Sequence, residues 1–145
     1  MTADNYLEIL LVEDNPDDVE LALYALKANH LVNRIHVLRD GAEAVEWLFG
    51  SGEEAATPKP KVILLDLKLP KVDGLEILRR LKSDSRTRLI PVVMLTSSRE
   101  ERDIVASYDL GVNSYIVKPV DFEQFVDAVQ QLGLYWALLN QPPGL

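Results

Sequence analysis

Five side chains in this sequence have the types and positions needed for metal-assisted chemistry on a phosphate. Glu13 and Asp14 follow a first apolar run, Asp66 a second, Thr96 a third and Lys118 a fourth. These runs are Leu7–Val12, Val62–Leu65, Pro91–Leu95 and Tyr115–Val117. If they are parallel strands of one sheet, the five side chains meet at its carboxyl edge, where open sheets of this kind bind ligands.

The chemistry of such a cluster follows from its charges. Three carboxylates in one small space repel one another and do not all stay ionised unaided. Mg²⁺ relieves the repulsion, because it takes one or two carboxylates, keeps several waters and recruits phosphate oxygens. An aspartate beside the metal can act as a nucleophile toward phosphorus, while an ammonium and a hydroxyl neutralise charge on the transferred oxygens. The pattern therefore predicts a metal-assisted aspartyl phosphate.

The elements that must position these residues can be read from the apolar spacing. Three of the four runs are near-continuous, which is typical of strands buried on both faces, and Arg34–Leu38 is a weaker fifth run that can form an outer strand. Asn15 can cap a first helix, whose apolar face is Val19, Ala22, Leu23 and Leu26. Further helices are expected over Gly41–Phe49, over Asp73–Lys82 with Leu75, Leu78 and Leu81 inward, from Ser98 to Gly111, and from Asp121 with Phe122, Phe125, Val126 and Val129 inward. Strands alternating with helices predict a doubly wound parallel sheet of the α/β class.

Composition excludes several other classes of protein. The chain has 145 residues, which is enough for one domain with its own core, and no cysteine for a disulfide scaffold or a cysteine nucleophile. Its net charge of −8 gives no electrostatic reason to bind nucleic acid or an anionic membrane. Neither a signal peptide nor a membrane-spanning stretch is visible, so we expect a cytoplasmic protein.

At these positions the sequence resembles the receiver domains of two-component response regulators, the CheY-like family. The resemblance covers about residues 7–132, and its motifs appear in order at the ends of the expected strands. They are Leu10-Leu11-Val12-Glu13-Asp14, Leu64-Leu65-Asp66-Leu67-Lys68-Leu69-Pro70, Asp73-Gly74, Leu95-Thr96-Ser97 and Tyr115-Ile116-Val117-Lys118-Pro119. The resemblance implies a flavodoxin-like five-stranded parallel sheet in the order 2-1-3-4-5 with five helices. The Glu13-Asp14-Asn15-Pro16 start, the loop at 50–60 and the Tyr-Trp near the C-terminus are similar to the cyanobacterial-phytochrome subgroup.

The resemblance also implies a role for each matching residue. Asp66 matches the phosphoacceptor, Asp14 a direct Mg²⁺ ligand, Glu13 an acidic neighbour that reaches the metal through water, and Lys68 a ligand through its backbone carbonyl. Thr96 matches the hydroxyl that moves toward the phosphoryl group, Lys118 the cation that binds it, and Tyr115 the aromatic switch residue. The bond between Lys118 and Pro119 is expected to be cis. Lys68 departs from the small polar residue common at its position, but any side chain leaves the backbone carbonyl available.

We therefore expect a stand-alone response regulator rather than a classical enzyme. It would accept a phosphoryl group from a sensor histidine kinase and present a changed face to a downstream protein; the subgroup resemblance implies that this kinase is a phytochrome. That face comprises the fourth helix, the fifth strand and the fifth helix. The main alternative is an interaction module that works without phosphorylation. A haloacid-dehalogenase-type phosphohydrolase is disfavoured because Lys68 stands where a second aspartate is needed, and a dinucleotide-binding domain because no Gly-x-Gly-x-x-Gly follows the first strand.

The C-terminal part of the chain is unusually apolar. Residues 1–6 are expected to be a tail, 7–132 the receiver domain and 133–145 an apolar extension. Exposed apolar patches often mark protein contacts, so we expect a homodimer interface built from the fifth helix and the extension. Its candidate residues are Phe122, Phe125, Tyr135, Trp136, Leu138 and Leu139. The alternative is that the extension folds back over the chain's own core.

Overall fold

The computed structural model describes residues 9–27, 35–50, 60–97, 100 and 114–131. The strands are β1 (Ile9–Val12), β2 (Ile35–Leu38), β3 (Val62–Asp66), β4 (Val92–Thr96) and β5 (Ser114–Val117). The helices are α1 (Pro16–Lys27), α2 (Gly41–Phe49), α3 (Gly74–Ser83) and α5 (Phe122–Gln131). The fourth helix expected from the sequence lies outside the described residues, apart from Glu100, as do the expected tail and C-terminal extension.

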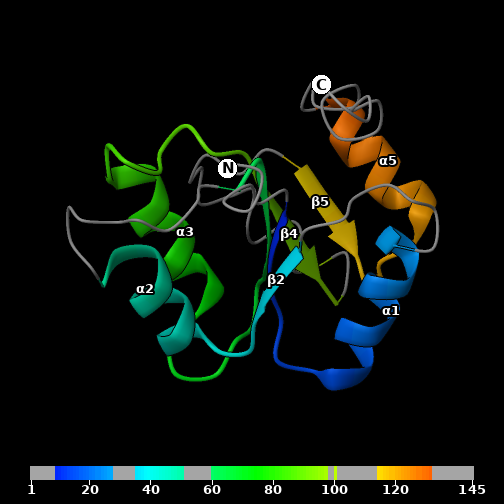
Figure 1. Ribbon diagram of the computed structural model, residues 1–145, viewed down its shortest axis with the longest axis horizontal. Helices are drawn as coiled ribbons and strands as arrows, with labels where there is room; N and C mark the ends of the chain where they lie inside the picture. The colour runs from blue at the N-terminus through cyan, green and yellow to red at the C-terminus, as the bar shows by residue number, and fades with distance from the viewer. Residues whose placement is uncertain (1–8, 28–34, 51–59, 98–99, 101–113, 132–145) are drawn as a thin grey trace, which may run out of the picture.

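All five strands are parallel, in the order β2-β1-β3-β4-β5. This confirms the expected fold class and strand order. Figure 1 shows three layers, with α2 and α3 on one side of the sheet and α1 and α5 on the other. The strands β1, β3 and β4 are buried along their whole length because helices cover both faces. In the described part of the chain, no helix is long and apolar enough to cross a membrane.

Two apolar clusters fill the spaces between the layers. One joins the sheet to α1 and α5 through side chains such as Val19, Leu26 and Phe125, and the other joins it to α2 and α3. The inward face of α3 differs from the expected one: Ile77, Leu78 and Leu81 are fully buried, whereas Leu75 is half-buried and packs against the cluster from its margin. Hydrophobic spacing gives the period of a helix, but it does not settle how the helix is rotated about its axis.

Phe125 corrects one expectation about the dimer interface. Its side chain is 0% exposed and lies in the cluster beneath α1 and α5. It therefore has no surface to offer a second copy of the chain, because the monomer's own core already uses it. The Phe122 side chain and the four candidates in the C-terminal extension lie outside the described residues, so the homodimer stays a prediction.

N-terminal caps start two helices directly after strands end at the carboxyl edge of the sheet. Asn15 Oδ1 accepts hydrogen bonds from the backbone N–H groups of Asp17 (2.8 Å) and Asp18 (3.2 Å), as expected for the cap of α1. Asp40 accepts a hydrogen bond from the backbone N–H of Glu43 at 2.7 Å and caps α2. Both helices thus begin within a few residues of the end of a strand.

Gly41 holds the loop after β3 against the start of α2. Its N–H donates to the carbonyl of Pro70 at 3.0 Å, and a Cβ at this position would overlap the backbone carbonyl of Val72. We expect Gly41→Ala to lower the free energy of unfolding by about 1–3 kcal/mol, because a backbone atom cannot easily yield to the added methyl. Alanine is the better helix former by about 1 kcal/mol, so the opposite sign would follow if packing were unimportant. Urea unfolding of the two proteins measures the difference, and equal or greater stability of the alanine variant would contradict this account.

Candidate functional site

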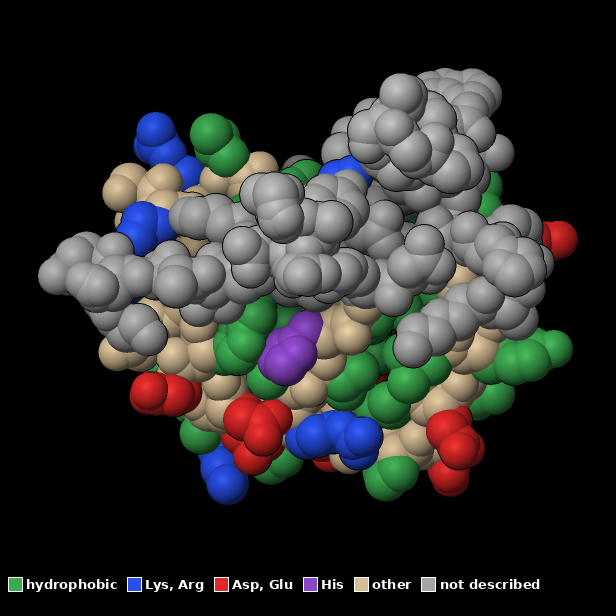
Figure 2. Space-filling model, in the orientation of Figure 1, with side chains coloured by type: hydrophobic (Ala, Val, Ile, Leu, Met, Phe, Trp, Pro, Cys, Tyr) green, Lys and Arg blue, Asp and Glu red, His purple; other side chains and the backbone are tan. Residues whose placement is uncertain are grey.

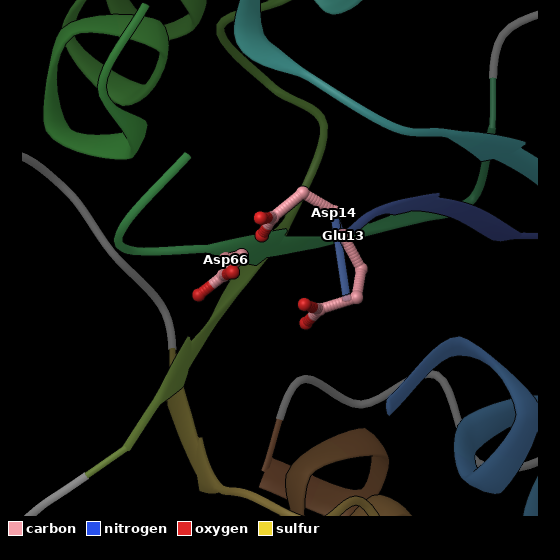
Figure 3. Close-up of side chains that lie close together, drawn as sticks. All are labelled: Glu13, Asp14 and Asp66. Atoms are coloured by element: carbon pink, nitrogen blue, oxygen red, sulfur yellow. The ribbon is translucent and has the colours of Figure 1, made fainter. Parts of the chain in front are cut away.

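The carboxylates expected at the sheet edge are found together. Glu13 and Asp14 directly follow β1, and Asp66 is the last residue of the neighbouring strand β3. Each offers a carboxylate oxygen, and these oxygens all lie within 4.8 Å of one another. Figure 3 shows the carboxylates of Asp14 and Asp66 turned toward the same space, with that of Glu13 beside it. The set can hold a hard divalent cation, which prefers oxygen ligands.

Burial divides these carboxylates into two kinds. Glu13 and Asp66 are only 1% and 3% exposed, whereas Asp14 is open to solvent. Burial raises the pKa of Asp66 to about 7, the negative charge of Glu13 adds to the rise, and Lys118 opposes it. A buried carboxyl that binds a proton near neutral pH lacks sufficient positive charge around it. A cation in this space would supply that charge, so the donor set fits a metal such as Mg²⁺.

Lys118 directly follows β5, and its side chain reaches the carboxylates of the site. Its ammonium Nζ donates hydrogen bonds to Glu13 Oε2 at 3.1 Å, to Asp66 Oδ2 at 3.2 Å and to Asp18 Oδ2 at 3.2 Å. Burial alone would lower the pKa of Lys118, but the charges of Asp66 and Glu13 outweigh burial and raise it well above its usual range. The ammonium therefore stays charged at any physiological pH. It supplies a fixed positive charge directly beside Asp66.

Thr96 ends β4 at the same edge of the sheet. Its side chain is 0% exposed, and among the described residues its hydroxyl oxygen Oγ1 has no hydrogen-bond partner. A buried hydroxyl without a partner is costly, and such groups are rare in folded proteins. The exception has a natural explanation if the hydroxyl binds a group that arrives during function.

Tyr115 and the segment after β5 complete the set of expected residues. Tyr115 is half-buried and packs against the cluster on the α2 and α3 side of the sheet, and it pairs with Met94 across the strands. The Lys118–Pro119 peptide bond is cis. The backbone N–H of Lys68, the residue expected to bind metal through its carbonyl, donates to Asp66 Oδ1 at 3.3 Å, while its side chain is exposed.

Sequence reasoning missed two residues that support this site. Asp18 is not among the residues expected at the site, yet its carboxylate contacts Lys118. Gln124, in the first turn of α5, is the second. Its own N–H does bond Asp121 Oδ1 at 2.8 Å, but its side-chain amide accepts from Val117 N–H (3.0 Å) and donates to the Pro119 carbonyl (2.9 Å). Gln124 thereby holds the backbone on both sides of Lys118.

A signal for Asp18 was present in the sequence. A helix that starts directly after β1 begins at the carboxyl edge, so the polar residues of its first turn are candidates for the site. The space-filling view shows acidic side chains along the lower edge of the molecule, where the loops that leave the strands lie in Figure 1 (Figure 2).

A doubly wound sheet with acidic residues after its first and third strands, a hydroxyl after the fourth and a lysine after the fifth defines a class of phosphoryl-accepting signalling domains. Residues 9–130 match the response regulator receiver domain, and the chain belongs to this family.

Three similar proteins match the chain over most of its length. The chain is 41% identical to "Response regulator Rcp1" of Synechocystis sp. (strain ATCC 27184 / PCC 6803 / Kazusa), covering 88% of this chain and 87% of Rcp1. It is 40% identical to "Probable methanogenesis regulatory protein FilR2" of Methanothrix harundinacea (strain 6Ac), covering 99% of this chain and 92% of FilR2. The solved bacteriophytochrome response regulator AtBRR is 57% identical, with a TM-score of 0.83, and the match covers 94% of this chain and 99% of that one. These matches confirm the resemblance to phytochrome response regulators.

Two further structures carry a metal or a modification. One is the Mn²⁺-bound form of Rcp1, at 41% identity and a TM-score of 0.70 over 90% of this chain and 94% of that one. The other is the phosphorylated cyanobacterial phytochrome response regulator RcpA, at 42% identity and a TM-score of 0.72 over 91% of this chain and 94% of that one.

Proposed function

We propose that this protein is a phosphorylation switch that accepts a phosphoryl group on Asp66 from the phosphohistidine of a sensor kinase. The observation that carries the proposal is the position of the Asp66 carboxylate. It is buried at the sheet edge, lies within 4.8 Å of two other carboxylates and is hydrogen-bonded to the Lys118 ammonium at 3.2 Å. The phosphorylated RcpA structure, a family member of similar fold, supports the same role here.

Asp14 and Asp66 would hold Mg²⁺ directly, Glu13 through water and Lys68 through its backbone carbonyl. The pKa of Asp66, raised to about 7 by burial and by Glu13, supports this assignment because it reports a shortage of positive charge. The Mn²⁺-bound form of Rcp1 supports a divalent metal in this family. When bound, the metal supplies positive charge to the carboxylates and to the phosphoryl oxygens.

The transfer itself needs few protein groups. An ionised oxygen of Asp66 attacks phosphorus and forms a new P–O bond, while the P–N bond to the donor histidine breaks. The electron pair returns to the imidazole, which takes a proton from solvent. Lys118 donates to a phosphoryl oxygen as negative charge accumulates there, and the unpartnered Thr96 hydroxyl donates to another.

Phosphorylation then changes the protein surface through local electrostatics. The group adds close to two negative charges and new acceptor oxygens. Movement of Thr96 toward them would empty space beside β5 and allow Tyr115, which is half-buried now, to turn inward. We propose that this shift alters the face that includes β5 and α5 and so changes affinity for a downstream protein. The similarity to phytochrome response regulators supports a light-sensing kinase as the phosphoryl donor.

The test is the intact mass of the protein after incubation with acetyl phosphate and Mg²⁺. We expect a gain of one phosphoryl group that requires the metal and is absent in Asp66→Asn. No gain with acetyl phosphate or with a phosphorylated kinase of this class would contradict the proposal and favour an interaction module that works without phosphorylation. A gain that persists in Asp66→Asn would place the acceptor elsewhere.

A further inference from the structure

The ammonium of Lys118 has all of its donors in use before any phosphoryl group arrives. A lysine carries three N–H donors and no acceptor. Here they are directed at Glu13 Oε2, Asp18 Oδ2 and Asp66 Oδ2, at 3.1 to 3.2 Å. A phosphoryl oxygen can therefore accept a hydrogen bond from Lys118 only if one of these three carboxylates loses its own.

The three carboxylates are not equivalent in this exchange. Once Asp66 carries a phosphoryl group, its own carboxyl is an uncharged acyl group and a weaker acceptor. The Lys118 N–H that now points at Asp66 is therefore the one that can turn toward the phosphoryl oxygens. Glu13 and Asp18 keep their charges. The side chain of Glu13 is 1% exposed, whereas that of Asp18 is 25% exposed and comes from a helix rather than from a strand end.

Asp18 is also separate from the carboxylates that would hold the metal. The group whose oxygens lie within 4.8 Å of one another consists of Glu13, Asp14 and Asp66. The backbone of Asp18 is held in position on both sides. Its N–H donates a hydrogen bond to Asn15 Oδ1 at 3.2 Å, and the next residue, Val19, is buried in the core. Its one ion pair among the described contacts is with Lys118.

We propose that Asp18 is a positioning residue that holds the Lys118 ammonium and offsets part of its charge, which keeps the phosphorylated state from accumulating. This inference rests on the proposed function. Asp18 adds a negative charge that repels both the anionic phosphoryl donor and the bound phosphoryl group. Two buried partners, Glu13 and Asp66, still hold the ammonium when Asp18 is neutral, so loss of repulsion outweighs loss of tethering.

The experiment compares Asp18→Asn with Asp17→Asn, which removes the same charge from the same helical turn. Asp17 is exposed, and no described contact joins it to Lys118. With saturating Mg²⁺ and acetyl phosphate, we expect Asp18→Asn to be phosphorylated about 3- to 10-fold faster than the wild type, in line with the weakening of a partly exposed charge pair. Asp17→Asn should stay within about twofold because its charge is solvated. Asp18→Glu, which restores the charge, should return toward the wild-type rate.

A second readout needs neither phosphate nor metal. In the unphosphorylated protein, NMR relaxation of the Lys118 ammonium should show greater mobility in Asp18→Asn than in Asp17→Asn, which a general structural role for Asp18 would not produce. If the wild type takes up no phosphoryl group, the proposed function fails. If the wild type is phosphorylated but Asp18→Asn behaves like Asp17→Asn, is slower than the wild type, or leaves the ammonium unchanged, only the inference about Asp18 is overturned.

Discussion

Replacing Asp66 with Asn should stabilise the metal-free protein at pH 8 by roughly 2–4 kcal/mol, although it removes the proposed phosphoacceptor. The pKa of Asp66 is raised to about 7, chiefly by burial and next by Glu13, from an ordinary value of 3.8. A carboxyl whose pKa is about 7 in the folded chain and 3.8 in the unfolded chain lowers the free energy of unfolding by roughly 4 kcal/mol at alkaline pH. A neutral amide of the same shape avoids that loss.

The pH dependence gives this prediction its sign. Below about pH 4 the carboxyl of Asp66 is protonated in both states, so the wild type and Asp66→Asn should differ little. As the pH rises from 4 to 7, the unfolded chain loses its proton first, and the wild type loses stability relative to the variant. Above pH 7 the difference should be constant. Urea unfolding at several pH values, in the presence of a chelator, measures it.

Asp14→Asn is the matched control for this measurement. Asp14 belongs to the same group of carboxylates but is exposed, so its charge stays hydrated and its removal should change stability by less than about 1 kcal/mol. Added Mg²⁺ should stabilise the wild type more than Asp66→Asn, since a ligand that binds only the folded state stabilises it. If Asp66→Asn were more stable than the wild type by the same amount at pH 4 as at pH 8, ionisation of Asp66 would not be the cause of the difference.

The residues of this site that sequence reasoning identified share one property: each lies at the end of an apolar run. Glu13, Asp14, Asp66, Thr96 and Lys118 follow their runs directly, so the parallel sheet alone brings them to one edge. Asn15 was also predictable, because capping depends only on residues two or three positions away.

The residues that were missed depend on contacts between distant parts of the chain. Asp18 meets Lys118 across 100 positions of sequence, and whether it reaches the ammonium depends on how α1 is rotated against the sheet. The same uncertainty of rotation explains why Ile77 rather than Leu75 is fully buried in α3. Phe125 was assigned both to a core face and to an interface, and packing between α1 and α5 decides for the core.

Replacing Lys118 with Met should affect stability and phosphoryl transfer together. Glu13 is 1% exposed and would lose the cation 3.1 Å from its carboxylate, and Asp66 would lose the charge that opposes the rise in its pKa. Leaving one partner of a buried ion pair alone typically costs about 3–5 kcal/mol. Here we expect about 2–4 kcal/mol at pH 8, because Asp66 can take up a proton. The rate of phosphorylation should fall about 100- to 1000-fold, the usual effect of removing one group that stabilises charge in the transition state.

The pH again separates this account from a simple packing defect. As the pH falls through the raised pKa of Asp66, this carboxyl takes up a proton and no longer needs the ammonium, so the destabilisation in Lys118→Met should shrink. A loss of the same size at pH 5 and pH 8 would indicate that the lysine side chain matters for packing rather than for its charge. Lys71→Met is the control, because it removes a cation from the loop after β3 that is 65% exposed and pairs with Asp40 at 3.4 Å. That variant should lose less than about 1 kcal/mol and keep its phosphorylation rate, since an exposed pair contributes little.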